Sequence, residues 1–423
     1  MAASTTAATK KVRADAPVFT EGEAGLDAAW LGGVLGIDDI ESAKLEDFGP
    51  SGGSAGHMRR IVIARKGGAE GGRFLLKTTT PGGEGASKAL GTFRESLFFQ
   101  EFAPELRGML RLPEVQLAHA NADTGFKALI MEDLTGCIET GLLFGPFSPL
   151  NAGRDLEGAV ERSGGVTPAR VAAATALAGA RLHAKHWGDA SLTARSWLRG
   201  SQWALGEGRE AWEASQGHAA AMWTKAKGVI AAGGQPWWDS RVVDILDASF
   251  AKVSWADQVA RMTSSPWTLV HGDFHPGNFM WDPSATGADK ADPAGRSLAE
   301  QAADDVGRLV VLDMEVVGVG SGPQDLGQYA VSHADPAARR GFEDDVVALY
   351  HAELVRCGVD GSSFGLEACR EEYVRGGSER WMWLLAYIAG VCPEPLTHFL
   401  HDQVLAFCLD HGVTPETVGQ PRS

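Results

Sequence analysis

The chain changes character near residue 133, and this change limits the folds that it can adopt. Before it, short runs alternate apolar and polar side chains between glycine-rich turns, which is typical of antiparallel strands. The candidate strands are 43–48, 57–65, 73–78, 115–120 and 126–131, with one candidate helix at 87–102. After it, alanine- and tryptophan-rich stretches favour helices, the first predicted from 168 to about 187. The sequence therefore predicts an α+β fold, with a small β-rich part followed by a larger helical part.

These changes in composition also predict where the domains begin and end. Residues 1–20 are predicted to be a disordered tail, 21–133 the β-rich domain and 134–423 the helical domain. The tail is rich in Ala, Ser and Thr and carries three basic residues, so an organelle transit peptide within residues 1–17 stays open as an alternative. Within the helical domain, 282–307 is rich in Asp and Ala and is predicted to be a solvated acidic insertion.

Composition excludes several classes of protein. The formal net charge is −16, which argues against a partner that is a nucleic acid or an anionic membrane, because phosphate contacts need a basic surface. The longest strongly apolar run, 381–392, is shorter than the ~20 residues of a membrane-spanning helix, so it predicts a buried helix. The five cysteines form no CxxC pair, and their odd number argues against a disulfide framework. These features predict a cytoplasmic protein in a reducing compartment.

The segment TLVHGDFHPGNFMW, residues 268–281, carries the clearest chemical signal. An apolar run is followed by a loop that contains Asp273, and Asn278 lies five residues later. A second apolar run is followed by Asp313 and Glu315. Phosphoryl transfer needs one carboxylate to orient the acceptor hydroxyl, and oxygen ligands that hold Mg²⁺ against the phosphates. We therefore predict Asp273 as the catalytic base and Asn278 and Asp313 as ligands of Mg²⁺. Glu315 is a further candidate metal ligand.

These residues carry a family resemblance. HGDFHPGN followed by LDME resembles the catalytic loop and metal-binding segment of the aminoglycoside phosphotransferase and choline-kinase-like superfamily. The segment LHAKHWG, 182–188, resembles the ecdysteroid-kinase-like branch, whereas HPGN is closer to the aminoglycoside-type branch, so both branches stay open. The resemblance implies a two-lobed protein-kinase-like fold, with a small β-rich N-lobe and a larger, mainly helical C-lobe. Protein kinases carry HRD where this chain has HGD, which argues against a protein kinase.

The same resemblance implies a lysine that touches the phosphates of ATP. Lys77 ends the third candidate strand, RFLLK, and such a long side chain needs a partner that holds it in place. Glu95 lies on a face of the next candidate helix that is otherwise largely apolar, where an unpaired carboxylate would be costly. We therefore predict an ion pair between Lys77 and Glu95, with Glu101 as the competing partner.

Two further segments are predicted to contact the nucleotide. The Gly- and Ser-rich turn at 50–56 would let backbone N–H groups approach phosphate oxygens, although it is not a GxxxxGK[ST] loop. The segment ALIMEDL, 128–134, resembles the hinge whose backbone hydrogen-bonds adenine. The candidate nucleotide-binding residues in these two segments are Gly52, Gly53, Ser54, Glu132, Asp133 and Leu134. The resemblance also implies that Asp325 supports the catalytic loop through hydrogen bonds, and His271 is predicted to be a packed scaffold residue.

Together these features predict an ATP- and Mg²⁺-dependent phosphotransferase whose partner is a small-molecule hydroxyl acceptor. Aminoglycoside-, choline- and steroid-like acceptors stay open, because acidic side chains and tryptophans in the helical part favour different acceptors. The alternative is a catalytically silent, kinase-like protein that binds nucleotide or regulates another protein. A protein kinase is disfavoured by Gly272 and by the lack of an APE-type segment after Asp313.

Overall fold

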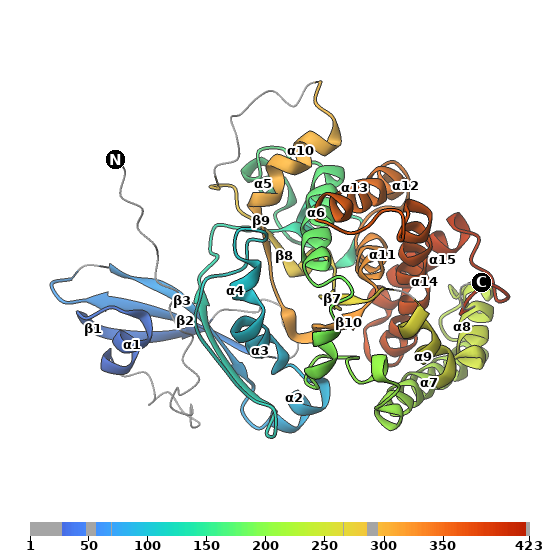
Figure 1. Ribbon diagram of the computed structural model, residues 1–423, viewed down its shortest axis with the longest axis horizontal. Coiled ribbons are helices and arrows are strands. Elements are labelled where there is room, and N and C mark those ends of the chain that lie inside the picture. Colours follow the sequence, from blue (N-terminus) through green and yellow to red (C-terminus); the bar gives the residue numbers. More distant parts are fainter. Residues whose placement is uncertain (1–27, 48–55, 69, 265, 286–294, 420–423) are drawn as a thin grey trace. The chain divides into compact units, whose positions relative to one another are not determined.

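The computed structural model describes residues 28–47, 56–68, 70–264, 266–285 and 295–419 (Figure 1). The predicted tail, residues 1–20, lies outside the described residues. The structure divides into two compact units that interleave along the chain. The first unit takes the chain up to Arg107, then Leu112–Thr135 and Met314–Val316. The second takes Gly108–Arg111, Gly136–Asp313 and the chain from Val317 onward.

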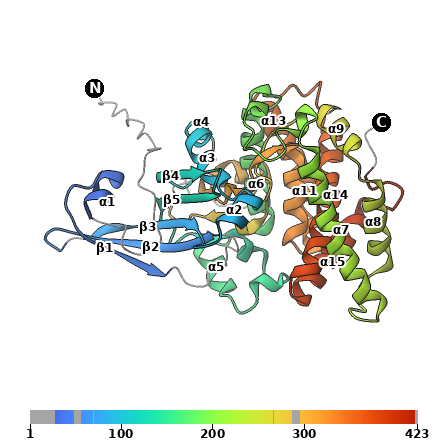
Figure 2. The same cartoon turned by 90° about the horizontal axis from the view of Figure 1, so that it is seen from below.

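The first unit is built on one antiparallel sheet with the strand order β1-β2-β3-β5-β4 (Figures 1 and 2). Its strands are β1 (Ile40–Asp47), β2 (Gly56–Arg65), β3 (Glu70–Thr79), β4 (Val115–Asn121) and β5 (Phe126–Glu132). Its helices are α1 (Ala28–Leu35), α2 (Glu84–Leu90), α3 (Arg94–Glu101) and α4 (Ala103–Leu106). Ile61, Ile63 and Leu76 from the strands pack against Leu31 and Leu35 of α1 in a buried core. The period-2 alternation of the sequence thus marks the buried face of the sheet, and all five predicted strands are confirmed.

The single helix predicted over 87–102 is wrong, because two helices, α2 and α3, occupy this stretch. Gly91 ends α2 in the left-handed region, with φ 77°, and its N–H donates to the carbonyl of Ser87. A glycine in this conformation closes a helix and redirects the chain. The second helix, α3, starts at Arg94 and carries Glu95 in its first turn.

The second unit is mainly helical. Its helices are α5 (Leu156–Arg162), α6 (Pro168–Lys185), α7 (Arg209–Ala231), α8 (Ser240–Lys252), α9 (Trp255–Ser264), α10 (Leu298–Asp305), α11 (Gly322–Ser332), α12 (Pro336–Arg340), α13 (Glu343–Arg356), α14 (Leu366–Val391) and α15 (Glu394–Asp410). Its short strands are β6 (Ile138–Glu139), β7 (Thr268–Val270), β8 (Phe279–Trp281), β9 (Leu309–Val311) and β10 (Gly318–Gly320). They form a β10-β7 pair and a β6-β8-β9 sheet. With the sheet of the first unit, these helices confirm the predicted α+β class.

The helix predicted from residue 168 is confirmed as α6. Thr167 caps α6, because its side chain accepts a hydrogen bond from the N–H of Arg170, and Pro168 takes the first helical position. The apolar run 381–392 forms the last turns of α14, as predicted, but it is buried only in its first half, and Val391 at its end is 55% exposed. Within the described chain, no helix is both long enough and apolar enough to cross a membrane. All five cysteines lie in the described part, and none forms a disulfide.

The prediction of a solvated acidic insertion at 282–307 is wrong at Asp282, which is buried, and in its last part. There α10 forms behind a capping box, in which Ser297 and Glu300 each accept a hydrogen bond from the other's backbone. Arg170 of α6 then donates two hydrogen bonds of 2.9 Å to the buried carboxylate of Asp305. This bidentate pair holds the acidic helix against α6.

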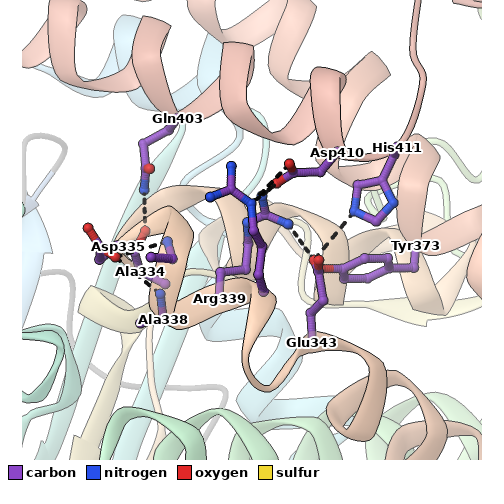
Figure 3. A network of polar contacts seen from close by, with 11 residues as sticks. Ala334, Asp335, Ala338, Arg339, Glu343, Tyr373, Gln403, Asp410 and His411 are labelled. Carbon is purple, nitrogen blue, oxygen red and sulfur yellow. Dashed lines mark hydrogen bonds and ion pairs between the residues drawn. The ribbon is translucent and has the colours of Figure 1, made fainter.

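A polar network joins α12, α13, α14 and α15 (Figure 3). Arg339 is 2% exposed and forms ion pairs with Glu343 and Asp410. The hydroxyl of Tyr373 donates to Glu343 at 3.0 Å, and His411 lies 3.4 Å from the same carboxylate oxygen. These contacts bring together residues from four helices, so the network fixes how the C-terminal helices pack.

This network predicts an acid-sensitive step in stability. Burial raises the pKa of Glu343, but the hydrogen bond with His411 and the charge of Arg339 outweigh burial and hold the pKa below its ordinary value of 4.5. A carboxyl whose pKa is lower in the folded state stabilises the fold above its unfolded pKa and loses that effect as the pH falls through its folded pKa. We expect Glu343→Gln to lower the melting temperature at pH 7 and to reduce the further loss on acidification below pH 4.5. Melting curves of Asp344→Asn, an exposed residue of the same turn, serve as the control, and an identical acid response of both variants would contradict the prediction.

Candidate active site

The loop that follows β7 is held by one buried carboxylate. Asp325, in the first turn of α11, accepts hydrogen bonds from the N–H of His271 at 2.8 Å and from the N–H of Gly272 at 3.2 Å. Gly272 has φ 79°, a left-handed conformation that favours glycine, and the ring of His271 contacts the carbonyl of Leu312 at 2.7 Å. The predicted supporting roles of Asp325 and His271 are thus confirmed, and together they present Asp273 at the end of the loop.

The carboxylate of Asp273 is held at both oxygens. Gln328 of α11 donates to its Oδ1, and the side-chain amide of Asn278 donates to its Oδ2, both at 3.2 Å. Burial alone would raise the pKa of Asp273. The hydrogen bond and charge of His275 and the charge of Arg380 outweigh burial and hold the pKa well below its usual range. The side chain is still 37% exposed. Asp273 is therefore an ionised, oriented and accessible carboxylate, as a base that orients a hydroxyl must be.

The structure connects Asn278 with the segment that carries Asp313. Asn278 closes a short 3₁₀ turn and donates from its side chain to the backbone carbonyl of Asp273 at 2.8 Å. The N–H of Leu312 donates to the backbone carbonyl of Asn278 at 2.9 Å, which places the residue before Asp313 beside the loop that carries Asp273. Asp313 itself has φ 58°, a conformation that costs a residue other than glycine on the order of 1 kcal/mol or more. Such strain is commonly found at active sites.

Asn278 and Asp313 offer the ligand atoms that Mg²⁺ prefers. Because the amide nitrogen of Asn278 donates to Asp273, its side-chain oxygen faces elsewhere, and among the described residues it accepts no hydrogen bond. Asp313 adds a carboxylate, and hard oxygen ligands of this kind fit Mg²⁺. Both residues belong to the second unit, as does Asp273. The second unit therefore holds the predicted base and both predicted metal ligands on adjoining segments.

Lys77 and Glu95 meet within the first unit. Lys77 lies on β3, and its ammonium nitrogen is 2.8 Å from a carboxylate oxygen of Glu95, so the predicted ion pair is present. The competing partner, Glu101, is exposed. Lys77 also lies 2.9 Å from Glu315, the residue that was predicted as a further metal ligand. In this structure the carboxylate of Glu315 balances the charge of the Lys77 ammonium group, and metal binding by Glu315 stays a prediction.

Sequence reasoning missed a second lysine, Lys127, in this cluster. Its side chain is fully buried, and its ammonium nitrogen lies 2.7 Å from Glu95 and also contacts Glu315. Because Lys77 pairs in register with Leu129, and Lys127 precedes Leu129 by two residues, both lysines lie on one face of the sheet. The sequence feature that could have revealed Lys127 is its position inside the apolar strand run FKALIM, because a charged side chain buried in such a strand needs a partner.

The four charges of this lysine–glutamate cluster, Lys77, Lys127, Glu95 and Glu315, balance one another. Burial raises the pKa of Glu95, but the charges and hydrogen bonds of Lys127 and Lys77 outweigh burial and lower the pKa to about 2. Glu95 is therefore ionised at neutral pH. The cluster joins β3, β5, α3 and the turn at Met314–Val316, which begins one residue after Asp313.

The predicted hinge and phosphate-binding turn are described only in part. Gly52, Gly53 and Ser54 lie outside the described residues. The N–H of Glu132 donates to the carbonyl of Glu114 at 2.8 Å. The side chain of Asp133 pairs with Arg60 at 2.7 Å and accepts a hydrogen bond from the N–H of Thr135, which fixes the turn that contains Leu134. Contacts of these residues with adenine stay a prediction.

Three comparisons relate this chain to known proteins. Curated proteins yielded no match. Among solved structures, choline kinase from Cryptosporidium parvum Iowa II is 10% identical with a TM-score of 0.46, over 89% of this chain and 92% of that chain. Ethanolamine kinase from Plasmodium vivax is 10% identical with a TM-score of 0.45, over 88% and 82%. A mutant of aminoglycoside 2'-phosphotransferase-IIIa in complex with GDP is 13% identical with a TM-score of 0.42, over 90% and 96%.

The family assignment rests on the sequence itself. A model of the phosphotransferase enzyme family, APH, matches residues 62–288, which is more than half of the chain. The matched stretch contains Lys77, Glu95, Asp273 and Asn278 and ends before Asp313. It confirms the resemblance predicted from the HGDFHPGN motif, and the five-stranded sheet followed by helices agrees with the kinase-like fold that the resemblance implied. The chain therefore belongs to the phosphotransferase enzyme family.

Proposed function

We propose that this phosphotransferase moves the γ-phosphoryl group of ATP to a hydroxyl group of a small molecule and needs Mg²⁺ to do so. The observation that carries the proposal is the state of Asp273. Its carboxylate is ionised, held at both oxygens and accessible on the loop that the family match covers. A carboxylate in this state is suited to orient an acceptor hydroxyl and to accept its proton.

Each unit would contribute a different part of the chemistry. In the second unit, Asp273 orients the acceptor, and Asn278 and Asp313 would hold Mg²⁺, which when bound offsets negative charge on the phosphates. In the first unit, Lys77 binds phosphate while Glu95 and Glu315 balance its charge. The turn with Gly52, Gly53 and Ser54 and the backbone of Glu132, Asp133 and Leu134 are the proposed contacts of the remaining nucleotide.

The acceptor is the open part of this proposal. Aminoglycoside-, choline- and steroid-like hydroxyl compounds are the classes to screen, with ATP consumption as the readout. A catalytically silent nucleotide-binding protein is the alternative, and the ionised Asp273 together with the oxygen ligands of Asn278 and Asp313 speaks against it.

Thermal melting tests the nucleotide site without knowledge of the acceptor. At a hundredfold its dissociation constant, a non-hydrolysable ATP analogue with Mg²⁺ stabilises a protein by ~2.7 kcal/mol, which raises the melting temperature by several degrees. We expect this rise for the wild type with Mg²⁺, a smaller rise with analogue alone, and loss of the Mg²⁺-dependent part in Asp313→Ala.

Asp345→Ala is the matched control, because Asp345 is an exposed aspartate of α13 in the same unit. A wild type that shows no shift at saturating analogue contradicts the proposed nucleotide site. A shift without ATP consumption, either with water or with any acceptor of the screen, favours the silent alternative.

A further inference from the structure

We infer that Arg380 of α14 is a positioning residue for the catalytic loop, and that it acts on Asp273 through the side-chain amide of Gln328. This inference rests on the proposed function, since it assigns a role in orienting the base of that reaction. It adds two residues, Arg380 and Gln328, that lie outside the stretch matched by the family model.

Within the second unit, a continuous chain of hydrogen bonds runs from Arg380 through Gln328 to Asp273, and we call this chain the relay. Helices α11 and α14 lie side by side (Figures 1 and 2). The Nε of Arg380 donates to the side-chain oxygen of Gln328 at 2.6 Å, and the side-chain nitrogen of Gln328 donates to Oδ1 of Asp273 at 3.2 Å. A second guanidinium nitrogen of Arg380 donates to the backbone carbonyl of Gly272, the residue before Asp273. Arg380 therefore holds the loop directly and the carboxylate indirectly.

The chemistry of the three groups gives the relay a direction. A guanidinium can only donate hydrogen bonds, whereas an amide side chain has one accepting end and one donating end. With its oxygen held by Arg380, Gln328 must point its NH₂ group at Asp273. Gln328 is 2% exposed and its amide is bonded at both ends, so its side chain has little freedom to turn away from Asp273.

The charge of Arg380 is also directed at the loop. Among the described residues, no carboxylate forms an ion pair with Arg380 within 4.0 Å, and the carboxylates that act on its charge are those of Asp273 and Asp325. Arg380 is half-buried, and opposite charges nearby offset the cost of taking its guanidinium partly out of water; here they are the carboxylates of the loop and of its support. The charge of Arg380 lies beside the HGD loop, residues 271–273, and its role is therefore to hold that loop.

The relay predicts a defect in turnover rather than in binding. Misplacing a reacting group by about 1 Å can cost on the order of 10²-fold in rate. We expect Arg380→Met to lower kcat for release of inorganic phosphate from Mg-ATP, with water as the acceptor, by about 10²-fold. The KM for ATP should change by less than about threefold, since neither residue of the relay is proposed to touch the nucleotide.

Companion variants separate positioning from folding. Gln328→Ala should also lower kcat, and the double variant should be no worse than Arg380→Met alone, because Arg380→Met already removes the contact with Gln328 and the contact with Gly272. Free guanidinium, added below its denaturing range, should restore part of the activity of Arg380→Met and none of that of Gln328→Ala. Arg370→Met on the same helix, at an arginine whose side chain is 41% exposed, is the matched control.

A second measurement tests the relay without turnover. In a sample labelled with ¹⁵N-glutamine, the side-chain NH₂ of Gln328 should exchange slowly with solvent, and Arg380→Met should accelerate this exchange. Unchanged exchange, additive losses in the double variant, or a kcat of Arg380→Met equal to that of the control overturns the inference. A wild type that consumes no ATP refutes the proposed function instead, and the exchange measurement then still decides whether Arg380 holds Gln328 against Asp273.

Discussion

Asp273→Asn is expected to lower the rate of phosphoryl transfer by at least about 10²-fold while nucleotide binding is retained. The substitution keeps the size of the side chain but removes the negative charge that orients a hydroxyl and accepts its proton. It also sets an NH₂ group against the donors of Gln328 and Asn278, where one of the two hydrogen bonds must be lost. ATP consumption measures the rate, and the shift of the melting temperature with ATP analogue and Mg²⁺ measures nucleotide binding.

The control for this variant is Asp360→Asn, an exposed aspartate in the loop between α13 and α14 that caps a turn in the same unit. It carries the same chemical change away from the catalytic loop, so its activity should equal that of the wild type. If Asp273→Asn consumes ATP at a rate close to that of the control, Asp273 is not the base. If it fails to bind nucleotide as well, the substitution has disturbed the fold of the loop, and Asp273→Ala must be compared with it.

Lys127→Met is expected to destabilise the fold by about 3–5 kcal/mol, the range for removing one partner of a buried ion pair. Without Lys127, the buried carboxylates of Glu95 and Glu315 share a single cation, Lys77. Because Lys127 is fully buried, water cannot replace its ammonium group. The free energy of unfolding, measured by chemical denaturation, reports the loss.

Removing the charge of Glu95 tests whether an unbalanced carboxylate causes the loss of stability in Lys127→Met. Adding Glu95→Gln to Lys127→Met removes the unbalanced charge, so the double variant should lose less than the sum of the two single losses. Lys88→Met, at an exposed lysine of α2, is the control and should leave stability close to that of the wild type. A loss in Lys127→Met no larger than that of the control would contradict a structural role of the cluster.

The charge state of Glu95 adds a pH signature to this prediction. Its pKa is lowered to about 2 in the folded protein, from an ordinary value of 4.5. Its contribution is therefore fully present above pH 4.5 and is lost as the pH falls toward 2. The difference in stability between the wild type and Glu95→Gln should narrow over that window.

Local patterns were sufficient to predict the strands, and they also led to a prediction of the chemistry of the loop. The alternation of Ile61 and Ile63 marked the buried face of β2, because the period of a strand is a property of its backbone. The spacing of Asp273, Asn278 and Asp313 predicts phosphoryl transfer, since one carboxylate can orient a hydroxyl while an amide and a second carboxylate hold Mg²⁺. The ion pair of Lys77 with Glu95 followed from the cost of leaving a carboxylate unpaired on an apolar face.

The tertiary structure decided which distant residues complete these groups. Lys127 and Glu315 are separated by 188 positions, and Arg380 contacts Gly272 across 108 positions. A sequence pattern shows that a buried charge or an amide needs a partner, but it does not show which one, because the partner is selected by packing of whole elements in space. The same reason explains the docking of α10 on α6 through Arg170 and Asp305. The sequence alone thus determined the strands, the family and the pairing of Lys77 with Glu95, and only the packed chain decided which distant groups neutralise this pair and orient the predicted base.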